Sequence, residues 1–146
     1  MKRDISIYLR KNDGIYIIPY GVTTQGFSYQ TEPYEFLPSD ADSETIWHAA
    51  QKALGNTNRV VPHPSSWDVI TPWFVKAGVK KWRDFAAKAK AIGLTERDEE
   101  ILFRVLHWDG RGFEGVPESK RSISKDAPLK EKLVLLEKSF ADAKLQ

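Results

Sequence analysis

The N-terminal part of the chain alternates apolar and polar residues, as a strand with one buried face does. Apolar side chains occupy every second position in residues 4–10, and turn-forming residues at 12–14 separate this stretch from an apolar run at 15–20. The pattern predicts a β-hairpin. Because Pro19 has no backbone N–H, we expect the second strand to end there. A further short strand is expected around residues 27–31.

The first helix is expected at residues 43–54, where apolar side chains recur at helical spacing. Gly55 follows as a stop signal, and Ser39 or Ser43 is the expected N-cap. In this interpretation the acidic residues of the segment 40–44 lie at the helix N-terminus, where carboxylates complement the helix dipole.

Two shorter helical segments are expected after a connector that spans residues 55–68. Thr71 and Pro72 form a good pair for the N-cap and first helical position, and Gly78 is a stop signal. A second helical turn or two is expected to hold Trp82, Phe85, Ala86 and Ala89. The connector itself contains a candidate short strand at residues 59–61.

The remainder of the chain is expected to form strands from residue 92 onward and then a final helix. Residues 101–106 alternate, and the turn residues 109–112 lead into a strand at 113–116. In the last helix we expect Pro128 in the first turn and Asp126 or Ser124 as the cap. One apolar stripe of that helix consists of Leu129, Leu133, Leu136 and Phe140.

This order of elements predicts an α+β fold in which about three or four helices pack on a mainly antiparallel β-sheet. The length of 146 residues suits a single domain over residues 1–146, and 41% hydrophobic residues suffice for a core. The absence of cysteine excludes disulfides, zinc ribbons, iron–sulfur sites and thiol nucleophiles. No apolar run reaches the roughly 20 residues of a membrane span, and no signal peptide is recognisable, so we expect a cytoplasmic protein.

Charge is distributed unevenly along the chain, although the net formal charge is only +2. Residues 12–51 carry a formal charge of −6, and residues 52–90 carry +6. Such separate tracts can present complementary faces to partners and orient their association. The alternative is that both tracts are ordinary solvated surface.

Candidate catalytic and metal-binding residues do not form a recognisable motif. The three histidines, which lack metal-ligand spacing, are His48, His63 and His107. A hydrolytic triad would have to come from Ser65 or Ser66, His63 or His107, and Asp68 or Asp109. There is no Gly-x-Ser-x-Gly elbow to support one, and the glycines at 110–112 are explained by a hairpin turn. We therefore expect no enzyme activity, no cofactor and no metal.

The basic tract offers one alternative function, because two tryptophans are interleaved with its cations. Trp73 and Trp82 could stack bases while neighbouring cations bind phosphates, as in single-strand binders. The cations of this alternative are Lys76, Lys80, Lys81 and Arg83. Against it, Trp82 has core-like spacing to Phe85, so a nucleic acid is not the expected partner.

Four segments in the second half of the chain carry a resemblance to a known family. They are Gly-Val-Lys-Lys-Trp-Arg-Asp-Phe at 78–85, Ala-Lys-Ala-Ile at 89–92, Ile-Leu-Phe-Arg-Val-Leu at 101–106, and Gly-Arg-Gly-Phe-Glu at 110–114. Together with the chain length and the order of elements, they resemble the immunity proteins of bacterial contact-dependent growth-inhibition (CDI) systems, mainly over residues 66–116.

The resemblance implies a cytoplasmic antitoxin without enzyme activity. It would bind and neutralise the C-terminal toxin domain of a contact-delivered effector, and many such toxins are nucleases. Acidic side chains could then occupy a basic nuclease cleft, with aromatic residues at the centre of the interface. The toxin-binding candidates are Asp40, Asp42, Glu44, Trp67, Asp109 and Glu114. Trp108 is expected in the core instead, and the sequence leaves the toxin's activity and the oligomeric state open.

Overall fold

The computed structural model describes residues 2–67 and 69–144, and in these residues it shows one α+β domain with nine strands and four α-helices. Asp68, an acid considered for a triad, lies outside them. The strands are β1 (Lys2–Arg10), β2 (Gly14–Thr23), β3 (Ser28–Gln30), β4 (Glu35–Leu37), β5 (Val60–Val61), β6 (Ala89–Arg97), β7 (Glu100–Trp108), β8 (Phe113–Gly115) and β9 (Arg121–Ser124). The helices are α1 (Ser43–Leu54), α2 (Pro72–Ala77), α3 (Trp82–Ala86), α4 (Leu129–Asp142) and the 3₁₀ helix η1 (Pro117–Ser119).

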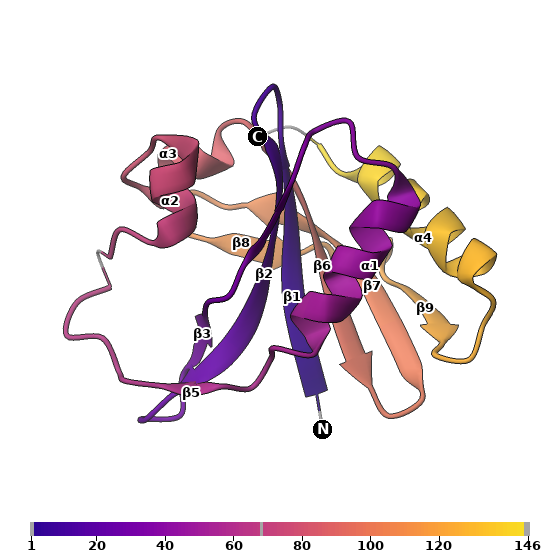
Figure 1. The fold of residues 1–146 in the computed structure, drawn as a ribbon, viewed down its shortest axis with the longest axis horizontal. Coiled ribbons are helices and arrows are strands. Elements are labelled where there is room, and N and C mark those ends of the chain that lie inside the picture. Colours follow the sequence, from indigo (N-terminus) through magenta and orange to yellow (C-terminus); the bar gives the residue numbers. More distant parts are fainter. Residues whose placement is uncertain (1, 68, 145–146) are drawn as a thin grey trace.

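The strands form one twisted sheet built around two long hairpins. The hairpins β1–β2 and β6–β7 meet where β1 pairs with β6, and the sheet order is β3-β2-β1-β6-β7-β8 (Figure 1). Strands β4 and β5 also pair with β2, and β9 pairs with β7. All of these pairings are antiparallel except that of β5 with β2. The predicted α+β class with a mainly antiparallel sheet is therefore confirmed.

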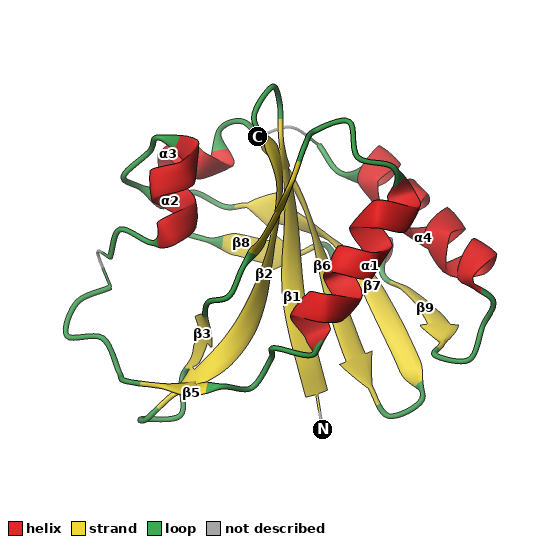
Figure 2. Cartoon of the chain, in the orientation of Figure 1, coloured by secondary structure: helices red, strands yellow, loops and turns green. Residues whose placement is uncertain are grey.

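The two faces of the sheet are covered by different helices. Along β1, Ile5 and Ile7 point to a core shared with α1 and α4, which lie side by side in Figure 2. Tyr8 points to the other face, where α2 and α3 add Phe74 and Phe85 to a second core. The first core is aliphatic apart from a few rings, whereas the second is largely aromatic. This division leaves part of the second face open beside α2 and α3.

Strand β2 continues through Pro19, so the prediction that the strand ends there is wrong. The Pro19 carbonyl accepts a hydrogen bond from the backbone N–H of Thr31 at 2.9 Å, on the side facing away from β1. The N and C=O of one residue point to the same side of a strand, so the missing N–H also lies on that side. Pro19 therefore pairs with Ile5 of β1 without removing a hydrogen bond from that ladder.

The cap of α1 is Asp42, not Ser39 or Ser43 as predicted. Its carboxylate Oδ1 accepts from the backbone N–H of Thr45 at 2.8 Å. Ser43 is the first helical residue, and its hydroxyl donates instead to Glu137 of α4 at 2.9 Å. Serine and aspartate both suit an N-cap, so the path of the chain, not residue type, decides which of them caps.

The start of α4 also differs from the prediction. Pro128 is the N-cap residue, immediately before the first turn, and no side chain caps the helix. Neither Asp126 nor Ser124 takes that role: the Ser124 hydroxyl accepts from the backbone N–H of Asp126 at 3.1 Å in the preceding turn. None of the helices in the described part of the chain is both long and apolar enough to cross a bilayer.

The predicted ends of α2 are confirmed, but α3 is shorter than expected. The Thr71 hydroxyl accepts from the backbone N–H of Phe74 at 3.4 Å, and Gly78 ends α2 in the left-handed conformation with φ of 73°. Ala89, predicted in the second helical segment, instead starts β6 opposite Arg10 of β1. Ala89 is fully buried in the sheet, which explains why its apolar position looked like part of a helix stripe.

Candidate functional site

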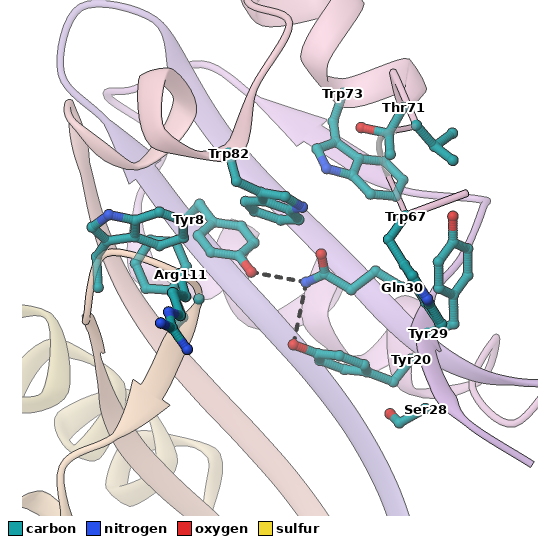
Figure 3. A pocket seen from close by; sticks show the side chains of 14 residues that line it. Tyr8, Tyr20, Ser28, Tyr29, Gln30, Trp67, Thr71, Trp73, Trp82 and Arg111 are labelled. Carbon is teal, nitrogen blue, oxygen red and sulfur yellow. Dashed lines mark hydrogen bonds between the residues drawn. The ribbon is translucent and has the colours of Figure 1, made fainter. Parts of the chain in front are cut away.

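A pocket lined by aromatic side chains, here called the aromatic pocket, opens on the sheet face beside α2 and α3 (Figure 3). Its volume is about 220 Å³, and eight of the fourteen described residues that line it are aromatic. The lining residues are Tyr8, Tyr20, Ser28, Tyr29, Gln30, Trp67, Val69, Thr71, Trp73, Trp82, Trp108, Arg111, Gly112 and Phe113. They come from five strands, two helices and two connecting segments, so the site exists only in the folded chain.

Tyr8 forms the floor of the aromatic pocket because it lies on the second face of β1. Its ring contacts Phe85 edge-on, with 5.3 Å between ring centroids, and Trp82 and Phe113 at 5.9 and 5.2 Å. Edge-to-face and tilted arrangements at such distances are favourable for aromatic pairs. The core ring of Phe85 thus holds Tyr8 and Trp82, which face the pocket.

Gln30 of β3 places an amide in the middle of the pocket. Its Nε2 donates to the hydroxyl oxygens of Tyr8 at 2.8 Å and Tyr20 at 3.4 Å (Figure 3). The Ser6 hydroxyl donates to Tyr20 at 3.1 Å. Burial raises the pKa of Tyr8 well above its usual value and also raises the pKa of Tyr20, so both phenols are neutral at physiological pH. The polar centre of the pocket is therefore uncharged.

Trp67 forms an exposed wall of the aromatic pocket. Its side chain is 57% exposed and contacts the rings of Phe27, Tyr29 and His63, with centroid distances of 6.1, 5.7 and 5.4 Å. The connector that carries it is anchored to the sheet, because His63 Nδ1 is 3.0 Å from the hydroxyl of the buried Thr23. A large aromatic side chain is thus held at the surface by its neighbours.

Two carboxyl groups, Asp109 and Glu114, flank the pocket-lining segment Arg111–Phe113 along the chain. The Asp109 carboxylate accepts from the backbone N–H groups of Gly112 and Arg111, at 2.9 and 2.7 Å, and these bonds lower the pKa of Asp109. Glu114 lies next to it, and the hydrogen bond and negative charge of Asp109 raise the pKa of Glu114. A protonated Glu114 donates to Asp109, whereas two charged carboxylates repel each other.

Replacing Asp109 by asparagine is expected to lower the pKa of Glu114 toward its ordinary value. The substitution removes the negative charge that opposes ionisation of Glu114, while Oδ1 of asparagine can still accept from the turn amides. NMR titration of the Glu114 side-chain carboxyl carbon measures this change. The control Asp126→Asn, in a different turn, should leave Glu114 unaffected. An unchanged Glu114 pKa in Asp109→Asn would contradict the pairing.

The six predicted toxin-binding residues fall on two separate surfaces. Trp67 lines the aromatic pocket, and Asp109 and Glu114 flank the lining residues Arg111 to Phe113. Asp40, Asp42 and Glu44 instead lie at the start of α1, which covers the opposite face of the sheet. There the hydrogen bond from Thr45 lowers the pKa of Asp42, and Glu44 is 3.7 Å from His48.

Several pocket residues were not singled out in the sequence. Trp108, expected in the core, is only partly buried and lines the pocket, with its ring 5.4 Å from that of Phe113. Tyr8, Tyr20 and Gln30 were also missed. One signal was available for Tyr8, since it is an aromatic residue on the polar face of an alternating strand.

The four cations of the basic tract proposed to bind phosphates do not line the aromatic pocket. Of the described residues that line the pocket, Arg111 alone is charged, so the four cations of the tract lie elsewhere. Lys76, for example, places its Nζ 4.6 Å from the ring centroid of Phe36. Trp82 has the expected core contacts, with its ring 4.9 Å from Phe74, but it also forms a pocket wall.

The histidines do not form a shared site, and each contacts residues of its own part of the fold. His63 is bound to Thr23, and His107 lies opposite Glu114 in the pairing of β7 with β8. Within residues 2–67 and 69–144, no group of three or more histidine and acidic side chains is arranged to hold a metal ion.

Comparison with known proteins finds likeness in fold but not in sequence. No protein-family model matches the chain, and no curated protein sequence matches it significantly. The solved structure of NMB0488, a protein of unknown function from Neisseria meningitidis, matches with a TM-score of 0.75 and 13% identity over 99% of this chain and 96% of its own. A chain of the CdiA-CT/CdiI toxin and immunity complex from Yersinia pseudotuberculosis matches with a TM-score of 0.71 and 15% identity over 99% and 98%. The fold of this chain therefore resembles that of a chain of this toxin and immunity complex over nearly its full length.

Proposed function

We propose that this chain is an immunity protein that binds and neutralises the C-terminal toxin domain of a contact-dependent growth-inhibition effector. The observation that carries the proposal is the aromatic pocket, with the exposed Trp67 at its wall. Tryptophan and tyrosine in partly desolvated pockets are the residues that dominate binding energy in protein interfaces. The fold likeness to a toxin and immunity complex supports the same function.

The charged groups around the pocket fit the polar rim of a protein interface. Asp109, Glu114 and Arg111 are exposed; Arg111 lines the pocket, and the two acids flank the lining segment Arg111–Phe113 along the chain. Rim charges of this kind orient the partner and exclude wrong partners more than they add affinity. A nuclease toxin, whose cleft must attract phosphate, would present cations to Asp109 and Glu114.

Neutralisation in this proposal is stoichiometric and needs no catalysis. The toxin is inactive for as long as the complex covers its active site or its substrate-binding surface. Asp40, Asp42 and Glu44 form a second candidate contact area on the α1 side of the sheet. The substitutions Asp40→Asn and Glu44→Gln test that area without touching the Asp42 cap.

Co-expression tests the proposed function directly. The C-terminal region encoded by the immediately upstream reading frame is expressed alone and together with this protein, and growth is recorded. We expect toxicity alone, rescue by this protein, and a one-to-one complex after co-purification. A neighbour that is harmless and does not bind would contradict the proposal.

A parallel assay distinguishes the nucleic-acid alternative. Binding of single-stranded RNA through phosphates should weaken steeply as salt is added, and should weaken further in the variant Lys80→Gln with Lys81→Gln. A protein interface with buried aromatic anchors should persist at the same salt. If the protein binds RNA in this salt-dependent way and does not rescue cells from the toxin, the nucleic-acid-binding function replaces the immunity function.

A further inference from the structure

The aromatic pocket contains a buried hydrogen-bond donor without a partner in the described part of the chain. It is the indole Nε1–H of Trp73, whose side chain is only 2% exposed. In Figure 3 this nitrogen faces Gln30 and Trp82, in the middle of the pocket. A buried donor without a partner costs free energy. A ligand that supplies an acceptor at this point therefore binds more tightly than one that does not.

Gln30 supplies the complementary acceptor beside that donor. Its amide nitrogen is already engaged by the hydroxyl oxygens of Tyr8 and Tyr20. The amide oxygen is therefore turned the other way, toward Trp82 and Trp73 in Figure 3. The Trp73 donor and the Gln30 acceptor thus both face the middle of the pocket, among aromatic side chains.

The size of the pocket limits the ligand to about one ring. A cavity of about 150 Å³ suffices for benzene, and pockets for drug-sized ligands usually start at about 300 Å³. The aromatic pocket, at about 220 Å³, lies between them. It suits a single six-membered ring with one polar substituent, which the surrounding tryptophan and tyrosine rings would contact.

From this geometry we infer that the aromatic pocket receives a tyrosine side chain of the partner protein, an inference that rests on the proposed function. The tyrosine hydroxyl accepts from Trp73 Nε1–H and donates to Gln30 Oε1. Phenylalanine supplies neither group, and tryptophan is a donor only, so it leaves the Trp73 indole unpaired.

Titration of the free protein with N-acetyl-tyrosinamide and N-acetyl-phenylalaninamide tests the inference. The five tryptophan indole N–H groups are followed by ¹H–¹⁵N NMR. We expect the tyrosine amide to bind with a Kd on the order of a millimolar and to shift the Trp73 indole proton downfield. The phenylalanine amide, which makes neither hydrogen bond, should bind roughly 30-fold more weakly, at about fivefold for each neutral hydrogen bond. Equal affinities, an unmoved Trp73 resonance, or tighter binding of uridine would overturn the inference.

A matched pair of variants identifies the acceptor. Gln30→Met should reduce the preference for the tyrosine amide to roughly fivefold, the part due to Trp73, while the phenylalanine amide still binds. Gln51→Met on the exposed side of α1 should keep the full preference. An undiminished preference in Gln30→Met would overturn the role of Gln30. These titrations use no toxin. If the tyrosine amide does not bind but the toxin complex still forms, the inference about a partner tyrosine is refuted, and the proposed immunity function is not.

Discussion

Replacing Trp67 by alanine is expected to weaken the proposed toxin complex by at least about 30-fold, without lowering the melting temperature of the free protein. Truncation of a central aromatic residue in an interface costs about 2–4 kcal/mol, and about 1.4 kcal/mol corresponds to a factor of ten in Kd. Trp67 is 57% exposed in the free chain, so its removal takes little from the folded state. Isothermal titration calorimetry and thermal unfolding measure the two quantities.

The substitution Val75→Ala is the matched control for Trp67→Ala. Val75 is 70% exposed on α2, and it is not among the described residues that line the aromatic pocket. Its truncation should change the Kd by less than about twofold, as for most peripheral contacts. If Trp67→Ala behaved like this control, the aromatic pocket could not be the centre of the interface, and the α1 acids would be tested next.

Much of the fold could be predicted from local signals in the sequence. The hairpin β1–β2 follows from alternation and from the turn residues 12–14, and Asn12 does adopt a positive φ of 64°. The ends of α2 follow from Thr71 and Gly78 in the same way. In each case the residues that carry the signal are within a few positions of the structure they determine.

Features set by distant parts of the chain could not be predicted in this way. Strands β4 and β9 are three and four residues long and mostly half-buried or exposed, so they show no clear period. Strand β2 tolerates Pro19 because the side that lacks the N–H faces away from β1. The pairing of β2 with β1 determines this orientation. Local residue types do not contain this information.

The candidate site shows the same limit more strongly. The exposure of Trp67 could be predicted from its connector, but its neighbours in the pocket come from segments far along the chain. Gln30 and Tyr8, which are hydrogen-bonded, are 22 positions apart. Hydrophobic periodicity identifies which face a residue occupies, but not which other residues meet it there. The division of the six predicted residues into two surfaces was for that reason not visible in the sequence.

Replacing Phe85 by alanine is expected to lower the free energy of unfolding by about 3–5 kcal/mol, the usual cost of removing a buried phenylalanine ring. Phe85 has no exposed surface, and its ring contacts those of Tyr8, Tyr16 and Trp82, with centroid distances of 5.3, 5.3 and 5.6 Å. The Arg10 guanidinium also lies 5.0 Å from its ring centroid. Urea unfolding followed by tryptophan fluorescence measures the change.

Phe27→Ala is the control, because Phe27 is 54% exposed and its loss should cost about 1 kcal/mol or less. A loss below that value in Phe85→Ala would mean that the second core does not hold α3 on the sheet. The milder variant Phe85→Leu keeps an apolar side chain in the core but removes the ring that supports Tyr8 and Trp82. It should remain folded yet bind the toxin more weakly, since the rings of the aromatic pocket depend on Phe85 for their position.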